Sequence, residues 1–225
     1  MFVGCSGDKT EETTKPNTIE IIDYKSQFIN KTNCNQIIDN EFITICYDYK
    51  LKAAKSVAYT LEGDLMNDTN IDKRPSFYSE KSLEKKYRIS TTDYTKSGYD
   101  RGHLAPDAAF DWSKESLTAV YTLANIIPQA PQVNRNMWSQ VEKYSRDKAV
   151  ELGQIDVINV IKYAKNTKKI GKNKISVSSG FYKVLYNKNL KYKECFYYSN
   201  RLNVSSRDDT VTKHNVACNK VVGKN

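Results

Sequence analysis

The sequence lacks a hydrophobic run that could cross a membrane as a helix. Its longest apolar stretches, such as 157–161 with Asn159 inside it, fall far short of the roughly 18 apolar residues that such a helix needs. Internal repeats and a second block of distinct composition are also lacking. A membrane-spanning or repeat protein is therefore not expected, and 225 residues are enough for one domain with a substantial core.

Cysteine pairs of the C-x-x-C type are absent as well, which leaves a zinc ribbon or a thioredoxin-like redox site without support. Cys34 and Cys46 flank one short segment, and Cys195 and Cys218 flank another near the C-terminus. This layout predicts two local disulfides, which persist in an oxidising compartment. We therefore expect an extracytoplasmic bacterial protein that is periplasmic, attached to the outer membrane or secreted.

The N-terminus has two interpretations. Phe2-Val3-Gly4-Cys5 resembles the end of a bacterial lipoprotein signal, in which the cysteine is lipidated and attaches the protein to a membrane. Its apolar stretch is shorter than the roughly 7 to 15 residues that a secretory signal needs, and the alternative is a free thiol on an unstructured segment. We expect residues 1–30 to form a flexible tether and residues 31–225 to form a single domain.

Acidic residues are in the minority. Lys and Arg number 35 against 26 Asp and Glu, which gives a formal net charge of +9. Such a charge favours polyanionic partners, and nucleic acid, anionic lipid and acidic glycans all remain open on this ground alone.

Hydrophobic periodicity predicts both strands and helices. Trp138, Val141 and Ser145 follow Asn134 at offsets of 4, 7 and 11 residues, which predicts a helix over 136–151. A short helix is expected over 113–119, a long connecting region over 62–98 and strands over 42–49, 56–61, 155–163, 174–178, 181–185 and 194–198. Together they predict an α+β domain with a central mixed or antiparallel sheet and flanking helices.

Histidine is scarce, so chemistry that depends on an imidazole has only His103 and His214 as candidates. His103 lies in Asp100-Arg101-Gly102-His103, beside a guanidinium and a glycine that permits unusual backbone geometry. No motif surrounds His214, which we expect to be structural or exposed.

Two oxygen-bearing side chains lie on or beside the predicted helix. Asn134 and Glu142 are separated by about 80° on a helical wheel, so both can point to one side. The amide oxygen of Asn134 could ligate a hard cation such as Mg²⁺, which takes only one or two protein ligands. The alternative is that Asn134 merely caps the helix N-terminus.

Three motifs in a consistent order resemble a known family. They are Tyr99-Asp100-Arg101-Gly102-His103-Leu104-Ala105-Pro106, Leu123-Ala124-Asn125-Ile126-Ile127-Pro128-Gln129 and Asn134-x-Asn136-x-Trp138-x-x-x-Glu142. With the stretch 170–185, they resemble the endonuclease G-like DNA/RNA non-specific endonucleases, whose fold carries a ββα-metal (His-Me finger) site. The resemblance covers about residues 40–200.

This resemblance implies a role for each matching position. His103 would be the general base that takes a proton from the attacking water, and its ordinary pKa of about 6.5 suits that task. Asn134 would ligate Mg²⁺, which Mn²⁺ could replace, and leave the charge of the cation available to the phosphate and the leaving oxygen. Glu142 would hold the waters around the cation, and Asn125 would help to orient the site.

Arginines would contact the phosphates of the substrate. The resemblance implies that Arg101 reaches the scissile phosphate or supports the site through Asp100. Arg74 resembles a family arginine that meets phosphate. Arg135 would add a further phosphate contact or, as the alternative, be a solvated surface charge.

The implied contacts go to phosphate, metal or water and none to a base edge, so DNA and RNA would both be cut without sequence preference. We expect hydrolysis of phosphodiester bonds to products with a 5′-phosphate, and the resemblance is compatible with a homodimer. The competing hypothesis is a catalytically silent nucleic-acid-binding or uptake protein at the cell envelope. A structural envelope lipoprotein, which rests on Cys5 alone, is a third.

Overall fold

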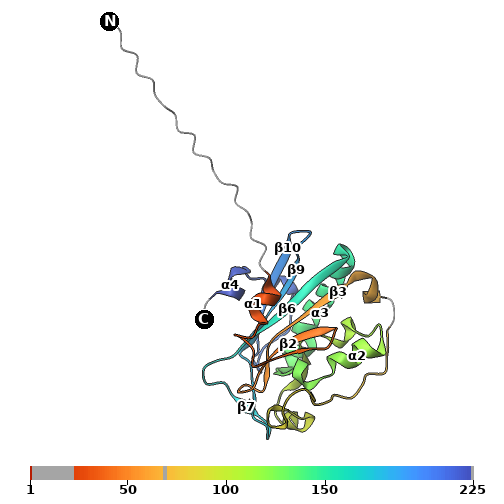
Figure 1. Ribbon diagram of the computed structural model, residues 1–225, viewed down its shortest axis with the longest axis vertical. Helices are drawn as coiled ribbons and strands as arrows, with labels where there is room; N and C mark the ends of the chain where they lie inside the picture. The colour runs from red at the N-terminus through yellow and green to blue at the C-terminus, as the bar shows by residue number, and fades with distance from the viewer. Residues whose placement is uncertain (2–22, 68–69, 224–225) are drawn as a thin grey trace.

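The computed structural model describes residue 1, residues 23–67 and residues 70–223. Its centre is a six-stranded sheet in the order β1-β2-β3-β6-β9-β10, in which every neighbouring pair of strands is antiparallel (Figure 1). The strands are β1 (Gln36–Asp39), β2 (Ile43–Asp48), β3 (Ala53–Glu62), β6 (Gln154–Lys162), β9 (Gly180–Asn187) and β10 (Tyr192–Ser199). The predicted α+β fold is confirmed, and its central sheet is antiparallel.

Helices cover both faces of this sheet (Figure 1). The α-helices are α1 (Tyr24–Phe28), α2 (Lys114–Val120), α3 (Ser139–Leu152) and α4 (Asn219–Val222). Along β9, Phe181 and Leu185 join the core on the α3 side, whereas Val184 and Tyr186 join the core beneath α1 and α4. This alternation follows from the two-residue period of a strand, and it explains why the central strands are apolar on both faces.

A two-stranded hairpin and a helix form a separate ββα unit on the α3 side. β4 (Asp100–His103) pairs antiparallel with β5 (Ile126–Gln129). The chain then enters a π-helical segment, Val133–Trp138, which continues directly into α3. Such π-helical turns interrupt the regular α pattern and are frequent at functional sites.

The predicted helix and connecting region are both present. Trp138, Val141 and Ser145 are buried, as their spacing indicated. Residues 63–98 hold only short 3₁₀ turns and a single β-bridge at Tyr78 in the part that the structure describes. This segment nevertheless contributes Arg74 to the candidate site described below.

Residues 24–29 are packed against the sheet and do not belong to a tether. Asp23 caps α1 by accepting a hydrogen bond from the backbone N–H of Ser26 at 3.3 Å. The side chains of Tyr24 and Ile29 are buried in the core beneath α1 and α4. The domain therefore begins before residue 31. The expected lipid attachment at Cys5 lies outside the described residues.

Both predicted disulfides are confirmed. Cys34–Cys46 ties the chain after α1 to β2, and Cys195–Cys218 ties β10 to the beginning of α4. The two bonds therefore fasten the N-terminal and C-terminal helices to the same face of the sheet.

Replacing Cys195 and Cys218 with alanine is expected to lower the free energy of unfolding by about 3 kcal/mol, because the bond closes a loop of 23 residues in the unfolded chain. Urea unfolding of the variant beside the oxidised parent measures the difference. Peptide mapping under non-reducing conditions that found these cysteines as free thiols in the parent would contradict the pairing.

Candidate active site

The β4–β5 hairpin fixes the backbone of the Asp100-Arg101-Gly102-His103 motif. Asp100 lies opposite Gln129, and His103 lies opposite Ile126. Position 102 requires glycine, because a Cβ there would overlap the buried side chain of Gln129. The hairpin therefore holds both ends of the motif in one register.

His103 presents a ring nitrogen that has no partner inside the protein. The ring packs against Tyr121 and Phe77, with centroids 4.9 and 5.4 Å away, and its buried Nε2 makes no hydrogen bond to any described residue. Burial lowers the pKa of His103 to about 4, the charge of Asp107 opposes this shift, and that of Arg74 adds to it. The imidazole is therefore neutral around neutral pH and keeps a lone pair that can accept a proton.

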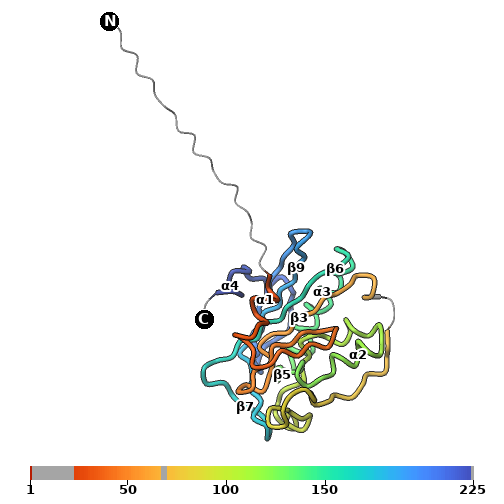
Figure 2. The backbone as a smooth tube through the Cα atoms, viewed as in Figure 1, coloured from red at the N-terminus to blue at the C-terminus, as the bar shows by residue number. Residues whose placement is uncertain are grey.

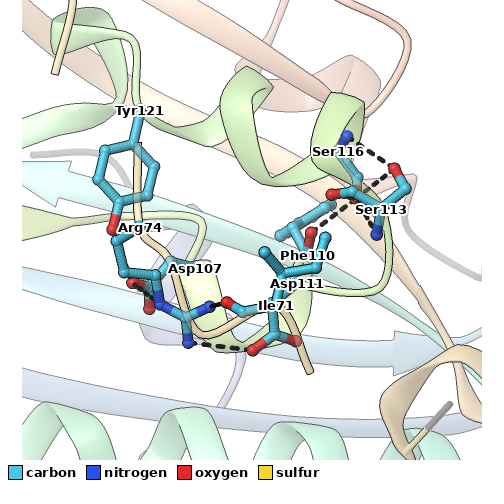
Figure 3. A network of polar contacts seen from close by, with 8 residues as sticks. All are labelled: Ile71, Arg74, Asp107, Phe110, Asp111, Ser113, Ser116 and Tyr121. Carbon is cyan, nitrogen blue, oxygen red and sulfur yellow. Dashed lines mark hydrogen bonds and ion pairs between the residues drawn. The ribbon is translucent and has the colours of Figure 1, made fainter. Parts of the chain in front are cut away.

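Arg74 reaches the same place from the connecting region. Its Nε lies 3.3 Å from Oδ2 of Asp107, and its Nη2 donates to Oδ2 of Asp111 at 3.0 Å. Figure 3 shows both contacts, with the Tyr121 hydroxyl close to Asp107, to whose Oδ2 it donates at 2.9 Å. The guanidinium is thus near His103 but is held by two carboxylates.

Asp100 connects the hairpin to the π-helical segment. Its carboxylate accepts hydrogen bonds from Asn134 Nδ2 at 3.1 Å and from Arg135 Nε and Nη2, both at 2.8 Å. The amide nitrogen of Asn134 therefore faces Asp100, which leaves the amide oxygen turned away. Capping does not occupy this side chain, because Asn134 lies inside the segment Val133–Trp138, whose N-cap position is Gln132. The capping alternative is wrong.

The two arginines of the motifs are in different states. Arg101 is exposed, its Cζ lies 5.0 Å from the Phe77 ring centroid, and it forms no ion pair with any described residue. Arg135 is exposed too, yet both prongs of its guanidinium bind Asp100. Arg101 is therefore the guanidinium that is available to an incoming anion.

Asn125 is completely buried, and all of its amide atoms are used within the protein. Its Nδ2 donates to the carbonyls of Ala105 and Val120 at 3.0 and 2.8 Å, and its Oδ1 accepts from the N–H of Ala105 at 2.9 Å. These bonds tie the chain just after His103 to the segment before β5. The arrangement suits a positioning role and leaves no atom for a ligand.

Glu142 on α3 lies near charged groups of the same helix, of β9 and of the segment that follows His103. Burial raises the pKa of Glu142 to about 7, although the positive charges of Lys183 and Arg146 pull it down. The charge of Asp107 adds to the rise and places Glu142 near the surroundings of His103. Arg146 was not expected from the sequence, although its position one helical turn after Glu142 was an available signal.

Lys183 is a second residue that the sequence analysis missed. It lies on β9 between the inward-facing Phe181 and Leu185 and is fully buried. Its Nζ donates to the Tyr59 hydroxyl at 3.1 Å and lies 4.4 Å from a ring centroid of Trp138. Burial lowers the pKa of Lys183, and the carboxylate of Glu142 opposes this. A lysine at an inward position of an apolar strand was the signal that could have found it.

The donor atoms at this site fit a hard cation that keeps most of its waters. No group of three His, Cys, Asp or Glu side chains suited to a metal occurs in residues 23–67 and 70–223. A cation would depend on the outward-turned amide oxygen of Asn134, next to the negative charge of Asp100. A set of oxygen donors with few protein ligands fits Mg²⁺ better than Zn²⁺.

Several known proteins are similar to this chain in sequence or in fold. Residues 25–221 match the family model of the DNA/RNA non-specific endonucleases. Mitochondrial endonuclease G of Homo sapiens is 30% identical over 160 residues, which cover 67% of this chain and 54% of that protein. A nuclease of Nostoc sp. is 31% identical over 112 residues, 49% of this chain and 40% of that protein. This chain belongs to the DNA/RNA non-specific endonuclease family.

A solved structure supports the fold. The EndoG of a crystallised EndoG/EndoGI complex superposes with a TM-score of 0.75 at 22% identity, covering 82% of this chain and 81% of that one. The chain spans about half the length of the curated relatives it matches. None of the helices in the described residues combines the length and the apolar character needed to cross a bilayer.

Proposed function

We propose that this chain is a metal-dependent endonuclease that hydrolyses the phosphodiester bonds of DNA and RNA without sequence preference. One observation carries the proposal. A single ββα unit carries both the imidazole of His103, which no described residue holds by a hydrogen bond, and an amide oxygen of Asn134 that points away from Asp100. Membership of the family supports a nuclease that uses a divalent metal.

His103 takes a proton from the attacking water in this proposal. Contacts with Phe77 and Tyr121 hold the imidazole in place, and no hydrogen bond to a described residue occupies it. Mg²⁺ or Mn²⁺ held at Asn134 would supply positive charge to the scissile phosphate and to the leaving oxygen. Glu142, when ionised, accepts hydrogen bonds from waters in the site.

Arg101, Arg135 and Arg74 contribute to phosphate binding in different ways. Arg101 is unpaired and exposed, so it contacts the scissile phosphate directly. Arg135 and Arg74 are each tied to carboxylates, and they contribute mainly through the fields they create. No residue of the site is directed to a base edge in this proposal, which supports cleavage of both polymers.

The two disulfides support a location outside the cytoplasm, where such bonds persist. Lipidation of Cys5 would hold the enzyme at the bacterial envelope, and without it the protein would be periplasmic or secreted. The substrates there would be nucleic acids that enter from outside the cell.

Digestion of plasmid DNA and of RNA by the purified protein tests the proposed function. We expect cleavage of both with Mg²⁺ or Mn²⁺, fragments that carry 5′-phosphates, loss of cleavage with EDTA and recovery when the metal is restored. A protein that binds both polymers but cuts neither with any divalent metal would overturn the proposal and support the silent nucleic-acid-binding protein instead.

Replacing Asp100 with asparagine is expected to weaken the response to Mg²⁺ and lower cleavage by about 10- to 100-fold, the usual cost of removing a residue that orients a metal ligand. The variant loses the charge that turns the amide of Asn134 and holds Arg135. The measurement is the cleavage rate as a function of Mg²⁺ concentration.

Arg135→Ala is the matched control, because it removes the ion pair with Asp100 and keeps the hydrogen bond from Asn134. We expect it to raise KM for the polymer without moving the Mg²⁺ requirement. An Asp100→Asn variant with the Mg²⁺ requirement of the parent would show that Asp100 does not orient the metal ligand.

A further inference from the structure

Positive charge is concentrated on one hairpin outside the motifs. The hairpin contains β7 (Lys169–Ile170) and β8 (Ile175–Ser176), and we call residues 165–176 the basic hairpin. It carries five exposed lysines, Lys165, Lys168, Lys169, Lys172 and Lys174. None of them forms an ion pair with a described carboxylate. Uncompensated lysines this close in sequence create a strong local positive potential.

The basic hairpin is anchored to the body of the domain. The backbone N–H and Nδ2 of Asn173 donate to the two carboxylate oxygens of the buried Asp93 at 2.9 and 2.8 Å. Ile170 and Ile175 are buried in one cluster with Ile126 of β5. Figure 2 shows β7 at the same end of the molecule as β5. The basic hairpin is therefore held in place by the domain, which reduces the conformational entropy that is lost when a ligand binds.

A line of side chains leads from the basic hairpin to His103. Nζ of Lys168 lies 5.1 Å from the ring centroid of Tyr99, which directly precedes β4. Tyr99, Arg101 and His103 are alternate residues leading into and along β4, so they share one face. Contacts with Phe77 support this, because Arg101 and His103 both pack on its ring.

The length of this line matches a bound nucleic-acid strand. Two residues span about 6.6 Å of strand, so Tyr99 lies about 13 Å and Lys168 roughly 18 Å from His103. That distance corresponds to fewer than five phosphate steps along one strand of a duplex, because the rise of about 3.4 Å per step is measured along the helix axis and successive phosphates lie farther apart than this. Arg101, between the two ends, would meet phosphates close to the scissile bond.

We infer that the basic hairpin is a docking surface for the phosphate backbone of the substrate, a few phosphates from the scissile bond. This inference rests on the proposed nuclease function and extends it to substrate length. Contacts to phosphate add affinity without reading sequence, so the surface favours long polymers over short ones.

The test compares two triple variants that remove the same charge. The first variant has alanine in place of Lys168, Lys169 and Lys172. The second has alanine in place of Lys188, Lys191 and Lys193. These three lysines are exposed on and around the β9–β10 turn, at the other end of the molecule (Figure 1). For a long duplex, we expect the first variant to raise KM about tenfold or more and to reduce the slope of log affinity against log salt by about 2 to 3. The control should change KM less than about twofold.

A short substrate separates docking from damage to the site. A trinucleotide cannot reach the basic hairpin, so the Lys168, Lys169 and Lys172 variant should cut it at about the parental rate. Equal losses in both triple variants, no loss in either, or an equal loss on trinucleotide and polymer would each overturn the inference. If the parent cuts nothing, the proposed function fails, and fluorescence anisotropy with the same duplex still decides whether the basic hairpin binds it.

Discussion

Replacing His103 with alanine is expected to lower the rate of phosphodiester cleavage by about 10²- to 10⁴-fold, the contribution usual for a general base. The reason is that His103 supplies the imidazole of the ββα unit, and no hydrogen bond to a described residue occupies its ring. The only other histidine is committed elsewhere: His214 hydrogen-bonds the Tyr197 carbonyl and Asp209 and stacks on Tyr198. Initial rates on plasmid DNA and on RNA at saturating Mg²⁺ measure the loss.

The chain offers a matched control for this variant in His214→Asn. We expect that change to lower the melting temperature, because it disturbs a packed and hydrogen-bonded ring, while the cleavage rate stays near that of the parent. The His103→Ala variant should show the converse, with little change in melting temperature. A His103→Ala protein that is folded and cuts within about tenfold of the parental rate would rule out His103 as the general base.

The parts of the site that the sequence revealed are those carried by short contiguous motifs. His103 and Asn134 could be named because their motifs keep a fixed spacing, and the ββα unit carries both, with Asp100 at the other end of β4 from His103 bound to Asn134. The strands of the sheet could be predicted for a similar reason, since their β-branched and aromatic residues are local signals. Short elements such as β1 and α1 were missed, because four or five residues carry too little periodicity to be recognised.

Charge partners that meet across the fold could not be predicted in this way. Arg74 was a candidate, yet its contacts with Asp107 and Asp111 depend on how the long connecting region returns to the domain. The hydrogen bond between Lys183 and Tyr59 joins residues 124 positions apart. Burial also changes the chemistry that a residue type suggests: His103 was expected near its ordinary pKa, and its surroundings lower that pKa to about 4.

The directions of these shifts assign the acid limb of the pH profile to Glu142. The imidazole of His103, with a pKa of about 4, is neutral well below neutral pH, whereas the carboxyl of Glu142 loses its proton only at about 7. Glu142 must be ionised to accept hydrogen bonds from waters in the site. As the pH falls through about 7, cleavage should therefore decline while His103 is still able to act as a base.

Replacing Lys183 with methionine is expected to move this acid limb upward by about one pH unit or more, because an opposite charge near a carboxyl typically lowers its pKa by about 1 to 3. The buried ammonium of Lys183 favours the ionised form of Glu142, and methionine fills a similar volume without a charge. At neutral pH a smaller fraction of Glu142 would be ionised, so kcat/KM falls about fivefold or more and recovers in alkaline buffer. The measurement is kcat/KM against pH for parent and variant.

Two further variants make this result decisive. Lys193→Met removes an exposed lysine on the next strand, β10, and should leave the acid limb where it is in the parent. Lys183→Gln keeps a donor for the Tyr59 hydroxyl while removing the charge, so it should shift the limb as methionine does even if methionine impairs folding. If the role of Lys183 is purely structural, its variants should lower the cleavage rate equally at every pH. That outcome would show that the buried ammonium of Lys183 does not set the pKa of Glu142 and that another group produces the acid limb.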